Sequence, residues 1–510
     1  MLEIFRDTPI GHLIRFLSKN RLLQYPEEAA DFALPVEAKR DAGSNSSDQD
    51  VVVISWYGDD DAANPQNWSK IKRAVVSFVL WYYTFTVYAT ASIYINSIGG
   101  IMEEFGVGTI AATLGFSLYV LGYGIGPMVF SPLGEIAAIG RNPTYILTMI
   151  VFVILSIPTS FTPTYAGLLV LRFLQGIFGS PCLATGGATV ADMYSMAVLP
   201  YAMLAWVSAS YFAPALGPLL SGFIAPATNW RWALHTSLIL SAFALVLMLL
   251  LLPETSHDNI LLRRAARISR ATGVRVLAPS QARKTKLDAM GVFVDAIIKP
   301  LEISIKDPAI LFVQIYTSII YGIYYSFFEA FPLVYPTEYG MSTSQLGLVF
   351  LCILVGGGIG ILIYSMIVYS MSGKATTVNE SRLVPALGFV FAPTIGLLLF
   401  AWSARSSIHW IVPTIGITMF AAGGFVVFQC IFIYVPISYP QYAASLFAAN
   451  GFFRSTLAAG SVLFAHPLFD NLGIARGVSL LGGLSVIGIV GMWLLYGYGA
   501  KLRAMSRFTA

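Results

Sequence analysis

The stretch LLVLRFLQGIFGSPCLATGGATVADMYS, residues 168–195, decides the fold, because it is apolar enough to cross a bilayer yet contains two charges, Arg172 and Asp192. A charge inside the bilayer costs roughly 3 kcal/mol or more, so such residues face a protein interior or a wet cavity and are candidates for function. Small residues between the charges allow close helix packing in lipid. We interpret the stretch as a packed transmembrane helix with a buried arginine. The alternative is that Arg172 extends to the membrane interface and only anchors the helix.

Composition places the whole chain in a membrane. Hydrophobic residues make up 56% of the 510 residues and charged residues only 11%, whereas soluble domains carry about 25% charged residues. A helix needs about 20 apolar residues to cross a bilayer. We therefore predict twelve spans, at residues 74–98, 110–131, 143–160, 165–193, 200–224, 233–252, 310–333, 345–371, 383–403, 410–435, 442–464 and 474–498.

The spans fall into two groups of six, and a pattern repeats between the groups. Residues 114–126 and 346–358 both read L-G, eight residues, G-x-G, in the second span of each group. Parallel six-span repeats are one of the established transporter plans. The prediction is an all-α membrane protein with two six-helix bundles. Its segments are a tail at 1–72, a bundle at 73–252, a central loop at 253–308, a second bundle at 309–499 and a tail at 500–510.

The distribution of Lys and Arg predicts that both termini are cytoplasmic, since cytoplasmic loops carry the positive excess. The opposite loops at 99–108 and 334–344 carry only acidic charges, with Arg231 and Arg405 as exceptions elsewhere on that side. The central loop holds ten basic residues: Arg263, Arg264, Arg267, Arg270, Arg275, Arg283, Lys284, Lys286, Lys299 and Lys306.

The N-terminal tail alternates apolar and basic residues over positions 2–23, which is typical of an amphipathic helix lying on a membrane surface. A loosely ordered tail is the alternative, because Pro9 to Gly11 interrupt the pattern. Residues 41–50 form a linker with a sequon at Asn45, which would not be used in the cytoplasm.

Span five reads YFAPALGPLLSGF at residues 211–223. Pro214 and Pro218 each remove a backbone donor and bend the helix, and Gly217 and Gly222 give a smooth face at the bend. One hypothesis is a tight contact between the halves, with the glycines at 356–360 of span eight as the matching surface. The alternative is a kinked helix packed for stability alone.

These motifs resemble the major facilitator superfamily, and more closely its fungal twelve-span drug:proton antiporters of the multidrug and fluconazole-resistance type. Residues 172–176, RFLQG, are similar to the R-x-x-Q-G motif of the fourth helix. Residues 217–222, GPLLSG, resemble the antiporter motif G-P-x-x-G-G with Ser221 in place of one glycine. The resemblance implies a monomeric, multi-pass transporter in the plasma membrane, with the vacuolar membrane less favoured, and not an enzyme.

The loop after span two departs from the family pattern. It reads SPLGEIAAIGRNP at residues 131–143, so Glu135 replaces the usual aspartate and Arg141 is retained. With Asp192, these residues would form a reduced cytoplasmic gate that rearranges on proton binding. A static surface ion pair worth about 0–1 kcal/mol is the alternative.

Glu329, in YGIYYSFFEAFP at residues 321–332, is the best membrane-embedded carboxylate and the predicted proton carrier. Asp192 is the second candidate, and Arg172 would tune a nearby acid. The alternative is that Glu329 is simply hydrated near the outer end of its span and carries no proton. Predicted substrate contacts are mostly aromatic, since aromatic rings stack on flat ligands: Tyr82, Tyr119, Tyr123, Gln175, Tyr211, Tyr321, Tyr324, Phe328, Gln429 and Asn450.

We expect no cofactor, metal site or nucleic-acid partner. The sequence lacks a G-x-x-x-x-G-K-[ST] phosphate loop, so a proton gradient would supply the energy. The favoured function is proton-coupled antiport that exports amphiphilic organic compounds, such as drugs, azoles, toxins or secondary metabolites, by alternating access. A proton symporter or facilitator for a small nutrient is the alternative. A sensor or channel is disfavoured by the charges at Arg172, Glu329 and Arg454.

Overall fold

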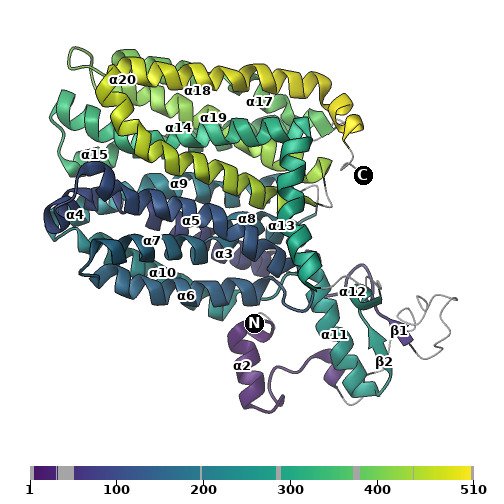
Figure 1. The fold of residues 1–510 in the computed structure, drawn as a ribbon. Helices are drawn as coiled ribbons and strands as arrows, with labels where there is room; N and C mark the ends of the chain where they lie inside the picture. The colour runs from purple at the N-terminus through teal and green to yellow at the C-terminus, as the bar shows by residue number, and fades with distance from the viewer. Residues whose placement is uncertain are drawn as a thin grey trace.

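The computed structural model describes residues 5–29, 32, 51–195, 198–282, 289–371, 379–439 and 442–506. Long helices side by side fill most of this part (Figure 1). The predicted linker at 41–50 with its sequon at Asn45, and the basic residues Arg283, Lys284 and Lys286, lie outside the described residues.

The first half of the membrane region contains a long first helix that continues through a short turn, and five further spans. Its helices are α3 (Lys70–Ser92), α4 (Ile98–Phe105), α5 (Thr109–Glu135), α6 (Arg141–Phe161), α7 (Tyr165–Gly179), α8 (Pro181–Met193), α9 (Leu199–Ala227) and α10 (Arg231–Leu251). The predicted fourth span is α7 and α8 together. The helix breaks at Ser180 because Pro181 begins α8 and has no N–H to donate to the preceding turn.

The second half repeats this plan. Its helices are α14 (Pro308–Tyr339), α15 (Thr343–Val349), α16 (Leu351–Met371), α17 (Val384–Phe389), α18 (Phe391–Ser403), α19 (Ile411–Ser438) and α20 (Ala443–Met505), with the 3-10 turn η5 (Asn379–Leu383) before α17. α20 is two helices joined at Gly473, whose φ of 76° is available to glycine without strain. The two arms of α20 fold back on each other at this glycine (Figure 1).

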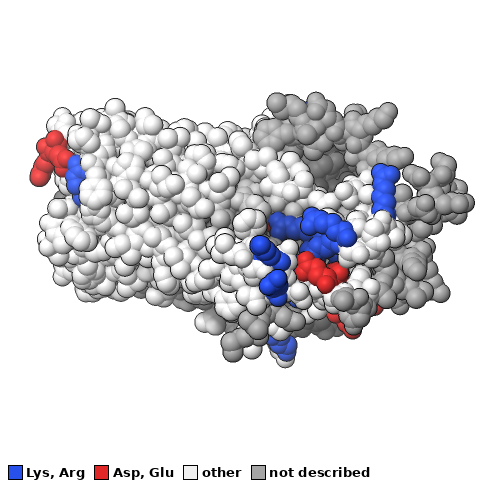
Figure 2. Space-filling model, turned by 90° about the horizontal axis from the view of Figure 1, so that it is seen from below, with Lys and Arg blue, Asp and Glu red and all other residues white. Residues whose placement is uncertain are grey.

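In the described part of the chain, eleven helical segments are long and apolar enough to cross a membrane, and the last of them contains both arms of α20. The prediction of twelve spans in an all-α membrane fold is thereby confirmed. Figure 2 shows a broad charge-free band between a small charged group at one end and a larger charged cluster at the other. The end near the C-terminus and the central segment is called the termini side below; the end with α4 and α15 is the opposite side (Figure 1).

The central segment is not the plain loop that the sequence suggested. It forms α11 (His257–Thr272), β2 (Arg275–Leu277), α12 (Pro279–Ala282) and α13 (Ala289–Lys306). β2 pairs in parallel with β1 (Val51–Val53) of the N-terminal tail, with Val52 opposite Val276. This two-stranded sheet is the exception to the helical fold within the described residues. Ile54, Leu261 and Ile268 form a small separate core beneath it.

The tail also contributes α2 (Pro9–Leu17), the turn η1 (Pro26–Glu28) and the turn η3 (Pro65–Asn67). α2 confirms the predicted amphipathic helix, although it is shorter than the pattern at 2–23. Pro9 does not interrupt it but occupies its first turn, where no donor is needed, and the Thr8 hydroxyl accepts from the Gly11 N–H at 3.2 Å. The tail unit, defined as residues 5–29, 51–67 and 257–282, is thus a small folded body on the termini side.

Ion pairs tie this tail unit together. Arg264 contacts Asp61 at 2.5 Å and Glu27 at 3.0 Å. Burial alone would raise the pKa of Asp61, but hydrogen bonds from Arg264 and from two backbone N–H groups lower the pKa below its usual 3.8. Burial, followed by the positive charge of Arg263, lowers the pKa of His12 below 6.5. The lowered pKa values favour an ionised Asp61 carboxylate and a neutral His12 imidazole near pH 7.

Candidate functional site

The two bundles meet along α5 with α20 and along α9 with α15 and α16. Ser117 of α5 donates to the Ala459 carbonyl of α20 at 2.8 Å. A Cβ placed on Gly124 would lie 2.6 Å from Cβ of Ser455, so the glycine allows the helices to touch. The halves are therefore packed closely, and groups on both sides of this interface are brought together.

At the centre of the interface lies an aromatic cluster with hydroxyl groups, defined by Tyr88, Phe116, Tyr123, Tyr211, Tyr321, Tyr324, Tyr325, Phe328, Phe425, Phe428 and Phe432. The Tyr123 hydroxyl of the first half meets those of Tyr321 and Tyr325 of the second half at 2.9 and 2.7 Å. The Tyr324 hydroxyl donates to the Tyr211 carbonyl at 3.0 Å. Five of the predicted substrate residues, Tyr123, Tyr211, Tyr321, Tyr324 and Phe328, belong to this cluster.

Arg454 of α20 is the cation of the cluster. Its guanidinium donates to the Tyr88 hydroxyl at 3.1 Å and lies 4.4 Å from the centre of the Tyr321 ring. It is 5% exposed, and none of the described carboxylates lies within ion-pair distance of it. Arg454 Nε, the Tyr211 hydroxyl and Gln429 Oε1 are buried without a hydrogen-bond partner among the described residues. Arg454 and Tyr211 belong to the cluster, and a ligand that carries acceptor and donor groups among aromatic carbon would satisfy their unpartnered atoms.

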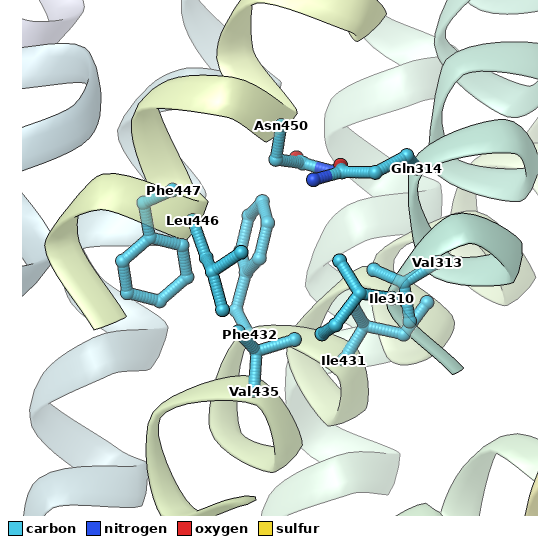
Figure 3. A pocket seen from close by; sticks show the side chains of 9 residues that line it. All are labelled: Ile310, Val313, Gln314, Ile431, Phe432, Val435, Leu446, Phe447 and Asn450. Carbon is cyan, nitrogen blue, oxygen red and sulfur yellow. The ribbon is translucent and has the colours of Figure 1, made fainter. Parts of the chain in front are cut away.

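Arg454 is the main site residue that the substrate prediction missed. The signal was present, because Arg454 is a charged residue inside the predicted span at 442–464. One turn away, the predicted contact Asn450 donates to Gln314 Oε1 and to the Thr317 hydroxyl, each at 2.7 Å. This amide pair closes one end of a small apolar pocket of about 10 Å³ between α14, α19 and α20 (Figure 3).

Other predicted substrate residues lie elsewhere. Tyr82 packs edge-on against Phe243 of α10, away from the cluster. Gln175 donates to the Ser156 hydroxyl within the first bundle at 2.8 Å. Gln429 donates to the Pro200 carbonyl at 3.2 Å and so joins the halves towards the termini side. Tyr119 belongs to the surroundings of Arg172.

Arg172 is buried in the first bundle with 0% of its surface exposed, so its side chain does not extend to the membrane interface. It donates to the carbonyls of Thr90 and Ala91 in the last turn of α3, at 3.2 and 3.3 Å, and to Gly115 of α5 at 3.3 Å. The last carbonyls of a helix have no partner within it. Arg172 therefore caps α3 inside the membrane. The rings of two tyrosines flank the guanidinium, at 4.8 Å for Tyr94 and 4.2 Å for Tyr119.

Glu329 is on α14 and is nearly buried, with a side chain 9% exposed. Its Oε2 lies 3.3 Å from Nδ1 of His466 on α20. Nε2 of the same imidazole lies 3.4 Å from Asp470, whose side chain is 56% exposed. Three titratable groups thus form a chain from the surface on the opposite side to the buried carboxylate. His466 was missed; the signal was its spacing from Asp470, because residues i and i+4 share a helix face.

Of the three residues of the predicted gate, Arg141 and Asp192 form an ion pair, and Glu135 interacts with both through its charge. Arg141 Nη2 lies 3.1 Å from Asp192, whereas Glu135 is exposed and forms no ion pair with a described residue. Glu254 is a further acid at this end, which the gate prediction did not include. Its carboxylate accepts the N–H groups of Arg141 and Asn142 at 3.1 and 3.2 Å and so caps the start of α6.

The glycines of span five do lie at contacts, but with different partners. A Cβ on Gly217 would lie 2.7 Å from the backbone N of Ile93, the residue that follows α3, within the first half. A Cβ on Gly222 would lie 3.0 Å from the Thr343 carbonyl and 3.4 Å from Gly347, both in α15 of the second half. The contact between halves therefore involves Gly347 and, within the stretch 356–360, Gly357, where an added Cβ would meet the Phe212 ring of span five. Gly356 and Gly360 pack on α19 instead. Pro214 and Pro218 lie inside α9, as predicted.

On the termini side, α13 crosses the junction of the bundles. Ile297 and Leu301 of α13 pack against Met128, Ala184 and Ala448, which come from both halves. Trp206 of α9 contacts Phe447 of α20 nearby, with ring centres 6.5 Å apart. The halves are thus in contact on both sides of the aromatic cluster.

Comparison with known proteins agrees with this architecture. The family model described as Major Facilitator Superfamily matches residues 80–464. The chain is similar to the MFS-type transporter pyvG of Aspergillus violaceofuscus, at 40% identity over the full length of both proteins. It is also similar to fluconazole resistance protein 1 of Saccharomyces cerevisiae, at 38% identity over 92% of this chain and 87% of that protein.

Among solved structures, the fold is similar to that of the proton:xylose symporter XylE, with a TM-score of 0.59 over 84% of this chain and 96% of that one. At 13% identity this likeness concerns the fold alone. From the matched family model, the full-length relatives and the two six-helix bundles together, the chain belongs to the major facilitator superfamily and is a membrane transporter, not an enzyme.

Proposed function

We propose that this transporter is a proton-coupled antiporter that exports neutral or weakly acidic aromatic amphiphiles, including drugs such as azoles, by alternating access. It would act as a monomer, without a cofactor, in the plasma membrane with both termini cytoplasmic. The name of the yeast relative, fluconazole resistance protein 1, supports export of drugs. The excess of Lys and Arg in the tail unit supports the orientation.

The observation that carries the proposal is that α14 and α20 each contribute residues to two places: the aromatic cluster, and the chain of titratable groups formed by Glu329, His466 and Asp470. α14 supplies Tyr321, Tyr325 and Phe328 to the aromatic cluster and supplies Glu329 to the titratable chain. α20 supplies Arg454 to the cluster and His466 to the chain. The contact between Glu329 and His466 therefore links two helices that line the substrate site.

This linkage gives a physical route for coupling. While Glu329 is ionised and His466 protonated, their attraction holds α14 against α20. A proton that enters past Asp470 and neutralises Glu329 weakens this attraction, so the helices can move relative to each other and change the cluster. By thermodynamic reciprocity, a substrate that favours one arrangement of the cluster changes the proton affinity of Glu329 by the same factor.

The cluster also suggests the charge of the substrate. A fixed cation at Arg454 without a described carboxylate partner disfavours organic cations and favours neutral or weakly acidic ligands. We expect Arg454→Gln to weaken binding of a weakly acidic aromatic compound about tenfold, as is typical for loss of a charge-assisted hydrogen bond, and to change a neutral one less. Equal loss for both compounds, measured by tryptophan quenching of the purified protein, would contradict this assignment.

Proton-flux measurements in reconstituted vesicles test the function. An inward proton gradient should drive substrate outward in the wild type. Glu329→Gln should lose this drive and retain gradient-free exchange of substrate for substrate. Glu338→Gln, a more exposed carboxylate on the same helix, is the matched control. Protons and substrate moving in the same direction would instead establish the symporter alternative. Full proton-driven export by Glu329→Gln would exclude Glu329 as the carrier.

A further inference from the structure

A groove on the outer surface of the first bundle joins the tail to the start of α6. It has a volume of about 430 Å³ and is walled by apolar residues of the two segments: Pro9, Pro143, Ile146, Leu147 and Ile150. Leu147 is 65% exposed, so the groove faces the region that lipid occupies. From position 142 to position 150, a helix rises about 12 Å. The groove therefore extends from headgroup depth into the acyl region.

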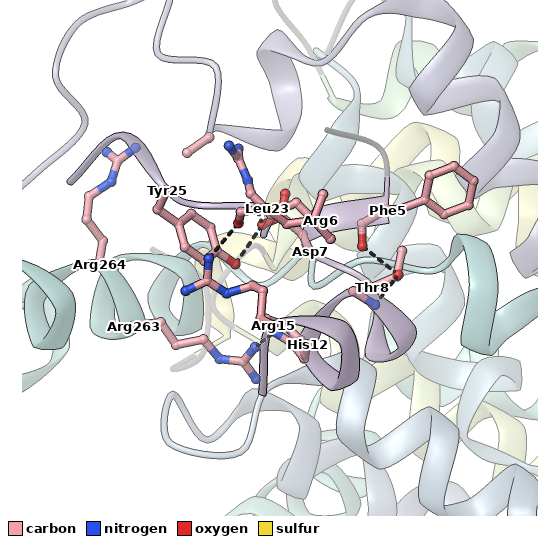
Figure 4. A network of polar contacts seen from close by, with 12 residues as sticks. Phe5, Arg6, Asp7, Thr8, His12, Arg15, Leu23, Tyr25, Arg263 and Arg264 are labelled. Atoms are coloured by element: carbon pink, nitrogen blue, oxygen red, sulfur yellow. Dashed lines mark hydrogen bonds and ion pairs between the residues drawn. The ribbon is translucent and has the colours of Figure 1, made fainter. Parts of the chain in front are cut away.

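The inner end of the groove joins a second cavity of about 390 Å³ inside the tail unit. Four residues line both spaces: Asp7, His12, Glu254 and Arg263. Figure 4 shows Arg263 reaching from α11 towards His12 on α2, where Arg263 Nη1 lies 3.3 Å from His12 Nε2. The charged cluster in Figure 2 lies at this end of the molecule.

The carboxylates at the junction already have partners. Asp7 lies 3.6 Å from Lys72 and accepts the Tyr25 hydroxyl at 2.9 Å. Glu254 accepts several backbone N–H groups, including those that cap α6. Arg263, in contrast, has no carboxylate within ion-pair distance among the described residues, and its hydrogen-bond contact is with His12. A positive charge thus remains uncompensated where the apolar groove ends.

α2 has an exposed apolar face beside this groove. Leu13, Phe16 and Leu17 are 54%, 79% and 72% exposed, and their i, i+3 and i+4 spacing puts them on one side of the helix. Arg15, on another side, is buried against Tyr25 and Glu28. A helix with one side fixed to the protein and an apolar side open, next to a lipid-facing span, has the character of an interfacial helix.

We propose that this junction is a binding site for one anionic phospholipid of the leaflet on the termini side. Its phosphate would lie against Arg263 and His12, and an acyl chain would occupy the groove along α6. The apolar face of α2 would enter the same leaflet and hold the tail unit at the membrane. The lipid thereby joins the tail, α6 and the central segment. The site does not depend on the transported substrate or on proton coupling.

Native mass spectrometry of the full-length protein in detergent tests the site, with phosphatidylserine and phosphatidylcholine of identical acyl chains as probes. We expect one phosphatidylserine to remain bound to the wild type and phosphatidylcholine to bind more weakly. Arg263→Gln should weaken phosphatidylserine binding about tenfold, the scale of one charge-assisted hydrogen bond. Arg270→Gln is the matched control, since Arg270 is exposed on the same helix.

Leu147→Trp tests the groove independently, because the larger side chain narrows it at an exposed position where folding is not at risk. Reduced phosphatidylserine occupancy in this variant supports an acyl chain along α6. Unchanged binding in Arg263→Gln, equal binding of the two lipids, or displacement of phosphatidylserine by millimolar inorganic phosphate would each overturn the proposal. Thermal unfolding confirms that each variant is folded before its lipid binding is compared.

Discussion

The role of Arg172 as a cap inside the membrane makes a quantitative prediction for Arg172→Leu. Each hydrogen bond to a charged group contributes about 1.5–3 kcal/mol, so the bonds to Thr90 and Ala91 account for about 3–6 kcal/mol. Each desolvated contact with a tyrosine face adds about 2 kcal/mol. Burying the charge costs roughly 3 kcal/mol in the opposite direction. The favourable contributions are larger, and we expect the substitution to destabilise the fold by about 4–7 kcal/mol.

Thermal unfolding of the purified variant in detergent measures this effect as a lower midpoint. Arg172→Lys should recover only part of the loss, because an ammonium group is a point charge and cannot span two carbonyls and two rings as a planar guanidinium does. Arg405→Leu is the control, since that arginine is exposed and surface substitutions usually change stability by no more than about 0.5 kcal/mol. An Arg172→Leu protein with wild-type stability but no proton coupling would refute the cap and make Arg172 a coupling residue.

Two further predictions concern the contact between halves and the tail unit. A Val side chain at position 222 would press on the Thr343 carbonyl, so Gly222→Val should slow transport in vesicles severalfold. Gly358→Val is the control and should not slow it, because an added Cβ at Gly358 has no neighbour within 4 Å. Equal transport rates for the two variants would contradict a role for this contact in closure. The lowered pKa of His12 means that the undocked tail binds a proton more readily. Docking of α2 should therefore be complete above about pH 6.5 and should weaken as the pH falls through the lowered pKa of His12. At lower pH, protonation of Asp61, whose pKa is also lowered, should weaken docking further. Weaker protection of the α2 amides at pH 5 than at pH 7.5, with each exchange rate divided by the intrinsic rate at that pH, checks this, and a pH-independent protection would contradict it.

The membrane spans were predictable from the sequence because a span is a continuous run of apolar residues, which can be recognised without knowing what it packs against. The fourth span was predicted at residues 165–193, and its helices begin at Tyr165 and end at Met193. Pairings between distant segments left no such signal. β1 and β2 are each three residues long, and in the sequence β1 precedes the first bundle whereas β2 follows it. Likewise, the contact of Gly222 with Gly347 joins two helices far apart in the sequence, and neither segment marks its partner.

Buried charge marks a residue in a membrane protein as a candidate for function, but it does not say which function, and the two buried arginines show why. Arg172 has its donors directed at carbonyls that would otherwise lack partners, so its charge is used by the protein itself. Arg454 contacts one hydroxyl and keeps a buried Nε without a partner among the described residues, and the buried Tyr211 hydroxyl of the same cluster also lacks one there. A buried donor without a partner is costly unless something binds it during the transport cycle. We therefore propose the unsatisfied arginine, and not the satisfied one, as the residue from which a substrate gains affinity, although both look alike in the sequence.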